Sequence, residues 1–196
     1  MAYKTGIIIL AAGSSSRLGQ PKQLLQYGGQ SLIRRIASHA TANNEHAVVV
    51  VTGANGDAIE KEAEGLQILT CRNDNWALGM GSSIAAGLKQ LLLAYPDILQ
   101  CIICVSDQPY VTNTVLQNIK NEQVKSGNGI IASLYSGTAG VPALFTKPFF
   151  DALLGLAGHE GAKKVILKYS DDVSLLSFEK GAIDIDTMDD YNQLTQ

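Results

Sequence analysis

Charge is scarce in this chain of 196 residues. Lys, Arg, Asp and Glu together make up 17% of the sequence, and the formal net charge is only −3. Such a balance gives no global electrostatic field that would attract nucleic acid or an anionic membrane surface. We therefore expect neither as a partner, so that any polyanionic ligand has to be bound by local groups.

Long hydrophobic runs are missing as well. The apolar run at residues 7–12 has the length of a buried strand and is far too short for a transmembrane helix. Gly13, Ser14 and Arg17 interrupt it before the apolar region of a signal peptide could form. The sequence therefore indicates a cytoplasmic protein.

Cysteine occurs only three times, at Cys71, Cys101 and Cys104, which is not an even disulfide framework. Cys101 and Cys104 have the spacing of a C-x-x-C pair but lie inside an apolar run. Residues three apart in a strand point to opposite faces, so these two thiols would not converge on a metal. We predict two buried core thiols.

Two widely used phosphate-binding motifs are absent. A Walker A loop requires Gly-Lys-Ser/Thr, whereas Gly19 is followed by Gln20. The dinucleotide fingerprint G-x-G-x-x-G fails in the same segment, and it fails again after Gly79 because Ile84 stands where the third glycine belongs. A nucleotide site in this chain must therefore be of another kind.

What the sequence does contain is an alternation of strand and helix patterns in its first half. Buried strands are predicted at 5–12, 46–52, 66–71 and 99–105, with helices at 31–40, 57–64 and 79–94 between them. This order predicts an α/β, Rossmann-like fold of three layers, with a mostly parallel twisted sheet and helices on both faces.

The second half departs from this alternation. Strands are predicted at 130–134, 141–145, 173–178 and 182–186, and helices at 112–125, 149–156 and 162–169. We expect mixed strand directions here and an insertion that covers the ligand. With no internal repeat or linker, the whole chain, 1–196, is interpreted as one domain.

The first polar cluster follows the first predicted strand, at the sheet edge where open α/β sheets bind ligands. Its small residues allow close approach of the backbone to a ligand, and successive N–H groups can form an anion-binding nest. Two basic side chains add positive charge where phosphate oxygens would lie. An ordinary βα turn is the alternative. The candidate residues are Leu10, Ala11, Ala12, Gly13, Ser14, Ser15, Arg17 and Lys22.

Two further clusters fall at predicted strand ends. Gly79, Ser82 and Ser83 begin a helix, where they could face a base, ribose or phosphate or serve as simple caps. Asp107 directly follows the strand at 99–105, a place suited to Mg²⁺ but equally to a turn. A second carboxylate could come from Asp184 or Asp186, which would share one face of a strand.

Taken together, the motifs resemble those of the molybdenum-cofactor nucleotidyltransferase family. The matching segments occur in the family's order along nearly the whole chain: LAAG at 10–13 with Arg17 and Lys22, NWALGMGSS at 75–83, VSDQP at 105–109, GVP at 140–142, GHEGA at 158–162 and DIDT at 184–187. The resemblance implies a fold like that of the nucleotide-diphospho-sugar transferases.

The resemblance also implies an activity. Within the family, Leu-Ala-Ala-Gly is typical of members that transfer CMP from CTP to molybdopterin, whereas guanylyl-transferring members usually have Leu-Ala-Gly-Gly. Arg17 and Lys22 would then bind the triphosphate, and Asp107 with Asp186 would hold Mg²⁺. The second substrate would lie at Gly140, Pro142, His159 and Glu160, and a client molybdenum enzyme is a further partner. His159 departs from the family, where an Asp is frequent.

Three other functions stay open at this point. The first is a different transferase of the same fold, which uses GTP or a sugar phosphate. The second is an NAD(P)-dependent oxidoreductase, since some chains that resemble this family carry that function. The third is a non-catalytic carrier or chaperone for a molybdenum enzyme.

Overall fold

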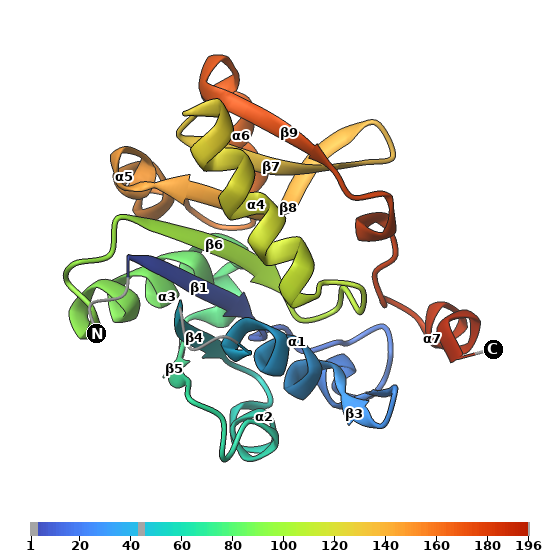
Figure 1. The fold of residues 1–196 in the computed structure, drawn as a ribbon. Helices are drawn as coiled ribbons and strands as arrows, with labels where there is room; N and C mark the ends of the chain where they lie inside the picture. The colour runs from blue at the N-terminus through green and yellow to red at the C-terminus, as the bar shows by residue number, and fades with distance from the viewer. Residues whose placement is uncertain (1–3, 43–45, 196) are drawn as a thin grey trace.

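A computed structural model describes residues 4–42 and 46–195. Its centre is a seven-stranded sheet with the order β5-β4-β1-β6-β8-β7-β9, shown in Figure 1. The strands are β1 (Thr5–Leu10), β4 (His46–Thr52), β5 (Leu69–Arg72), β6 (Gln100–Val105), β7 (Ile130–Tyr135), β8 (Thr138–Thr146) and β9 (Val173–Ser177). All six residues of β1 are buried, as expected for a strand that is covered on both faces.

The strand directions confirm a mostly parallel sheet with a mixed second half. β1, β4, β5 and β6 pair in parallel, β8 runs antiparallel to β6 and β7, and β9 is parallel to β7. From β1 the chain moves to β4 and β5 on one side and then returns to β6 on the other. The order therefore reverses between β1 and β6, which is where open α/β sheets bind ligands.

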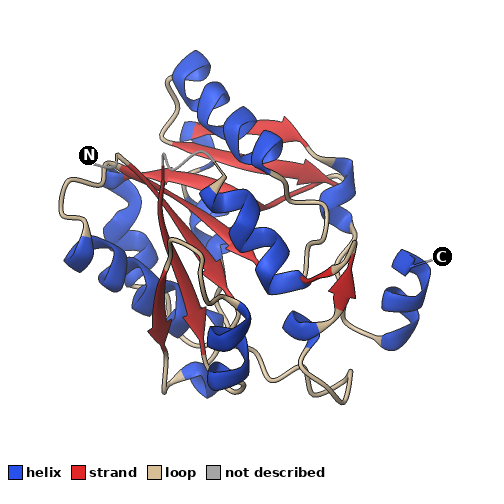
Figure 2. Cartoon of the chain, turned by 60° about the horizontal axis from the view of Figure 1, so that its bottom comes forward, coloured by secondary structure: helices blue, strands red, loops and turns tan. Residues whose placement is uncertain are grey.

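Helices cover both faces of the sheet, which confirms the predicted three-layer α/β fold (Figure 2). One face packs against α1 (Leu32–Thr41), α2 (Gly56–Glu62) and α4 (Asn113–Ser126). The other packs against α3 (Met80–Ala94), α5 (Phe150–Leu154) and α6 (Ala162–Lys168). Cys101 and Cys104 are both fully buried and belong to cores on opposite faces, as predicted.

Smaller elements connect these layers. The short strands β2 (Gln26–Tyr27) and β3 (Gln30–Ser31) form a hairpin before α1, and Ser31 caps that helix by accepting a hydrogen bond from the Arg34 N–H. The remaining elements are 3-10 turns, η1 (Lys22–Leu24), η2 (Trp76–Leu78), η3 (Lys147–Phe149), η4 (Ser170–Asp172) and η5 (Glu179–Ala182), and the terminal helix α7 (Met188–Thr195), which lies beyond the end of the sheet in Figure 1.

Some predicted boundaries were wrong. The strand predicted at 182–186 does not form: η5 ends at Ala182 and the chain continues as a loop to α7. β5 begins only at Leu69, and α5 is shorter than the helix predicted at 149–156. Apolar residues of these segments can be buried without belonging to the predicted strand or helix. Ile185, for example, is fully buried in a small cluster with Leu18, Leu25 and Leu32 rather than in the sheet.

The contact between α3 and the sheet leaves no room for a side chain at Gly87. A Cβ there would lie 2.6 Å from Cγ2 of Ile8 and 2.7 Å from Cγ2 of Val51. Both neighbours are themselves fully buried and cannot move aside. We predict that Gly87→Val lowers the free energy of unfolding by about 1–3 kcal/mol, the usual cost of overpacking a core. Urea denaturation would measure it.

The same helix offers the control. Leu93 is 80% exposed, so Leu93→Val places valine on α3 without crowding the core and should change stability by less than about 0.5 kcal/mol. Equal effects of the two substitutions would contradict the packing that we describe.

Candidate active site

A pocket of about 490 Å³ opens at the carboxyl ends of β1 and β6. It brings together ten of the residues predicted from the sequence, drawn from all three polar clusters. These are Leu10, Ala12, Gly13, Ser14, Arg17, Lys22, Gly79, Ser83, Asp107 and His159. Gln23, Trp76, Ala77, Met80, Val105 and Ser106 complete the lining. The reversal of strand order thus gathers segments that are distant in sequence.

The loop after β1 is held in shape by side chains beneath it. Ser15 has a φ of +54°, a conformation that is uncommon for a residue other than glycine. Its hydroxyl oxygen accepts a hydrogen bond from the Lys22 N–H at 3.0 Å. Gln23 Nε2 donates to the carbonyl oxygens of Ala11 at 3.2 Å and Gly13 at 3.0 Å. Gln23 was missed in the sequence because nothing in its spacing or composition distinguishes it.

Lys22 is at the centre of the charges in the site. Its Nζ atom lies 2.5 Å from Asp107 Oδ2 and 2.9 Å from Asp186 Oδ1. Arg17, which is largely exposed, contacts Asp186 Oδ2 at 3.1 Å. Burial would lower the pKa of Lys22, but the charges of Asp107 and Asp186 and their hydrogen bonds raise it above its usual range. The hydrogen bond from Lys22 lowers the pKa of Asp186 in turn.

Asp186 reaches this position without belonging to a strand. The Ile185 N–H donates to the backbone carbonyl of Asp107 at 3.2 Å, which ties the C-terminal segment to the end of β6. The Asp190 carboxylate accepts hydrogen bonds from the N–H groups of Asp186 and Thr187, and the Thr187 hydroxyl accepts in return from the Asp190 N–H. This reciprocal pair at the start of α7 fixes the segment before the helix. Partial burial of the Asp184 carboxyl group, together with the charges of Asp107 and Asp186, raises its pKa.

The carboxylates provide a donor set that suits a hard cation. Asp107 Oδ1 is buried and has no hydrogen-bond partner in the described part of the chain, while its other oxygen faces Lys22. Among residues 4–42 and 46–195, no group of three or more His, Cys, Asp and Glu side chains could hold a metal. Two carboxylates that leave the other coordination positions to phosphate and water match the preference of Mg²⁺.

The helix start at Gly79 packs against the loop that carries His159. The Gly81 N–H donates to the Gly158 carbonyl at 3.2 Å. Ser83 lines the pocket, and Ser82 is anchored outside it by Asn73 Nδ2 at 2.9 Å. Neither serine caps α3, because the residue before that helix is Gly79, which provides no side chain.

Several predicted residues do not line the pocket. Gly140 and Pro142 lie in β8, where a Cβ on Gly140 would overlap the Tyr135 hydroxyl. Glu160 turns toward its own loop and accepts from the Ala157 N–H at 3.1 Å. Ala11 is buried beneath the loop. Of the residues predicted to bind a second substrate, His159 is therefore the one that lines this pocket.

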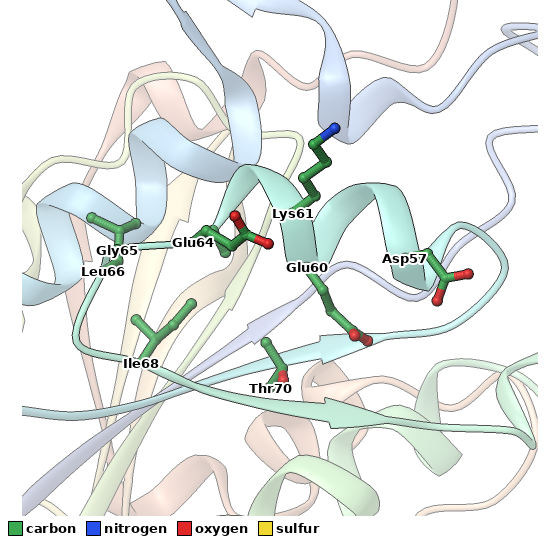
Figure 3. Close-up of a pocket in the computed structure, with 9 residues that line it drawn as sticks. Asp57, Glu60, Lys61, Glu64, Gly65, Leu66, Ile68 and Thr70 are labelled. Atoms are coloured by element: carbon green, nitrogen blue, oxygen red, sulfur yellow. The ribbon is translucent and has the colours of Figure 1, made fainter.

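A second hollow of about 570 Å³ lies at the edge of the sheet, between α2 and β5 (Figure 3). Asp57, Glu60, Lys61 and Glu64 line its polar side. Leu66, Ile68 and Thr70 line the side toward β5. None of the residues predicted from the sequence lies here. It is an open edge of the fold, remote from the reversal of strand order.

A three-layer α/β fold with a loop of small residues and two carboxylates at the point where the strand order reverses is that of a nucleotidyltransferase-like protein. Residues 7–173 match the model of the MobA-like NTP transferase domain, and the chain belongs to that family. Among the residues that the structure describes, no helix has the length and apolarity needed to cross a membrane.

Two curated relatives differ in extent. The chain is 26% identical over 188 residues to molybdenum cofactor cytidylyltransferase of Escherichia coli, covering 94% of this chain and 92% of that protein. It is 41% identical over 81 residues to nicotine blue oxidoreductase of Paenarthrobacter nicotinovorans, which is 41% of this chain and only 40% of the length of that relative.

Solved structures show the same fold. Rv0371c of Mycobacterium tuberculosis superposes with a TM-score of 0.79 at 25% identity, covering 99% of this chain and 98% of that one. A structure of the same protein in complex with manganese gives a TM-score of 0.73 at 23% identity, covering 99% and 98% of the two chains.

The close contact at Gly79 gives a prediction for the shape of the site. Gly79 has a φ of +115°, and a Cβ there would overlap the carbonyl group of Gly158. We predict that Gly79→Ala separates η2 and α3 from the loop of His159, so that the His159 ring signals shift in an NMR spectrum. Stability should fall by about 1–3 kcal/mol beyond the cost of the positive φ itself.

Gly137 separates these two effects. It also has a positive φ, +69°, but no atom lies within 4 Å of the position of its Cβ. Gly137→Ala should therefore cost only the conformational term of about 1–2 kcal/mol and leave His159 unchanged. An unshifted His159 in Gly79→Ala would show that the contact does not position this loop.

Proposed function

We propose that this protein transfers CMP from CTP to a molybdopterin-type molybdenum cofactor and releases pyrophosphate. The observation that carries the proposal is the meeting of three segments in one pocket: the loop of Ala12 and Gly13, the basic pair Arg17 and Lys22, and Asp107. The near full-length similarity to molybdenum cofactor cytidylyltransferase supports the acceptor and the base. The proposal also treats residues 1–196 as a single nucleotidyltransferase domain.

The reaction requires little from protein side chains beyond alignment and charge. An oxygen of the terminal phosphate of the acceptor attacks the α-phosphorus of CTP, and the bond from that phosphorus to the bridging oxygen of the β-phosphate breaks. Because the attacking group is already an anion, no general base is needed. Catalysis then rests on positioning and on stabilising the charge of the leaving pyrophosphate.

Lys22 is suited to that second task. An ammonium group has three donors, and Asp107 and Asp186 engage it at 2.5 and 2.9 Å, which leaves one for a phosphate oxygen. Its raised pKa keeps it charged at neutral pH. Arg17, 77% exposed at the mouth of the pocket, can turn its planar group toward the outer phosphates.

We assign Asp107 and Asp186 as the residues that would hold Mg²⁺. The unpartnered Asp107 Oδ1 atom supports this, as does the manganese complex of the structural relative Rv0371c. Bound there, a divalent cation supplies positive charge to the triphosphate. Lys22 lies between the same carboxylates, and its positive charge offsets their mutual repulsion when no cation is bound.

The proposed preference for cytosine rests on Ala12 and on the close packing of the pocket wall around it. A Cβ added to Gly53 would lie 2.9 Å from both the Ala12 Cβ and the Trp76 Cβ, so these residues pack closely at the carboxyl end of β4. Ala12 and Trp76 both line the pocket. We place the base beside this wall and the pterin on the side of His159.

One observation favours a second function. The similarity to nicotine blue oxidoreductase, although it spans only part of either chain, is the higher in identity. Oxidoreduction would require binding of a nicotinamide or flavin cofactor. Titration with NADH and NADPH tests this candidate separately from nucleotidyl transfer. Binding would be monitored by quenching of the fluorescence of Trp76.

A panel of nucleotides tests the assigned substrates. Pyrophosphate release would be measured with molybdenum cofactor and each of CTP, GTP, ATP and UTP in the presence of Mg²⁺. We expect turnover with CTP, because the relative that matches almost the full length of the chain uses cytidylyl transfer. Turnover with GTP alone would overturn the base assignment, and turnover with sugar phosphates as acceptors would overturn the molybdopterin assignment.

Asp107 provides the test of the catalytic centre. Asp107→Asn keeps the shape of the side chain but removes the charge that faces Lys22 and the proposed metal. We expect turnover to fall by about 10²–10³-fold, the usual effect of losing one preorganised electrostatic group. Because Lys22 keeps Asp186 as a partner, the thermal unfolding curve should remain cooperative.

The matched control is Asp97→Asn. Asp97 is exposed in the loop between α3 and β6, at the opposite end of the sheet. It should leave turnover unchanged. Full activity in Asp107→Asn would favour a non-catalytic carrier over an enzyme.

A further inference from the structure

We infer that Gln23 is a positioning residue for the nucleotide: it turns the loop after β1 so that the backbone N–H groups of Ala12 and Ser14 are presented to phosphate oxygens. The inference rests on the proposed function only in that a nucleoside triphosphate occupies the pocket. It does not depend on which base or acceptor is used.

Every polar atom of the Gln23 side chain is engaged inside the loop that it supports. The side chain is buried, with the residue only 1% exposed. Its amide nitrogen donates to the carbonyl oxygens of Ala11 at 3.2 Å and Gly13 at 3.0 Å. Its amide oxygen accepts from the hydroxyl of Ser15 at 3.4 Å, and Ser15 accepts from the Lys22 N–H.

These contacts fix the direction of the peptide groups. The peptide bonds of the loop are trans, since the cis bond of the described residues lies at Val141–Pro142. In a trans peptide the carbonyl and the N–H point in opposite directions. With the carbonyls of Ala11 and Gly13 turned toward Gln23, the N–H groups of the following residues, Ala12 and Ser14, point away from it.

Those two N–H groups remain available for a ligand. Within residues 4–42 and 46–195, neither Ala12 nor Ser14 donates its N–H to a protein acceptor. Both residues line the pocket. Two outward N–H groups two residues apart are a suitable pair of donors for the oxygens of a phosphate chain.

Filling the space beneath the loop would not by itself require an amide. Burying a polar side chain is unfavourable unless its hydrogen bonds are made, and an apolar residue of the same size would fill the space without that requirement. The amide at Gln23 therefore matters for what it does to the loop. The same turn, η1, carries the Lys22 ammonium, so one local structure orients both the charge and the backbone donors.

Binding measurements on Gln23→Met test the inference. Methionine has a similar volume and no donor, so the loop carbonyls lose their partner while the core stays filled. The affinity for CTP, measured by calorimetry, should fall about tenfold, equivalent to about 1.4 kcal/mol. The affinity for cytidine, measured by NMR titration, should stay within about twofold, because the nucleoside has no phosphate for these N–H groups.

Two more variants make the result decisive. Gln23→Glu retains the size but replaces the donor by an acceptor that faces two carbonyls, so it should weaken CTP binding at least as much. Gln26→Met is the matched control, since Gln26 is exposed and its Nε2 donates a hydrogen bond to the neighbouring Leu24 carbonyl at 3.4 Å. It should bind CTP as the unaltered protein does. Gln23→Met carries the test if the glutamate variant does not fold.

The inference is overturned if Gln23→Met binds CTP within twofold of the unaltered protein, or if it loses cytidine in the same proportion. Failure of the proposed function looks different. If the unaltered protein binds GTP rather than CTP, the cytidylyl proposal fails, and the same series with GTP and guanosine still tests Gln23.

Discussion

The ammonium group of Lys22 is the contact on which the site depends. It lies between Asp107 and Asp186, and these carboxylates come from the end of β6 and from the segment before α7. Without a cation between them, two like charges at this separation would repel each other. Because the pair is partly buried, this interaction is screened less than one at the surface. One side chain thus joins the loop after β1 to the segment before α7.

The position of that contact follows from the topology of the sheet. β1 lies between β4 and β6, where the strand order reverses, so its loop opens at the same edge of the sheet as the end of β6. Small residues after β1 let backbone line the resulting cleft. Lys22 follows at a distance that allows its side chain to reach back over the end of β6. The charge centre and the pocket are therefore two consequences of one strand order.

The sequence was a good guide where the signal is local. The unbroken apolar character of residues 7–10 identified a strand buried on both faces, and the burial of Cys101 and Cys104 on opposite sides follows from the same periodicity. The position of the loop after β1 and of Asp107 at the pocket was predictable because each directly follows such a strand. Features that depend on contacts between distant parts of the chain were harder to predict from the sequence. The amide nitrogen of Gln23 donates to carbonyl groups ten and twelve positions before it in the sequence. The stretch around Ile185 has the alternation of a strand, but Ile185 is buried against Leu18 and Leu25.

The two sides of the charge centre are built differently, and this difference bears on how the proposed reaction proceeds. Asp107 is 15% exposed, fixed at a strand end, and tied by its backbone to Ile185. Asp186 is 41% exposed and held by the cap of a short helix. Displacing Lys22 from Asp186 therefore costs less than displacing it from Asp107, because the more exposed ion pair is the weaker one. Under the proposed function, Lys22 would keep its contact with Asp107 when its free donor binds a phosphate oxygen, and any lengthening would fall on its contact with Asp186.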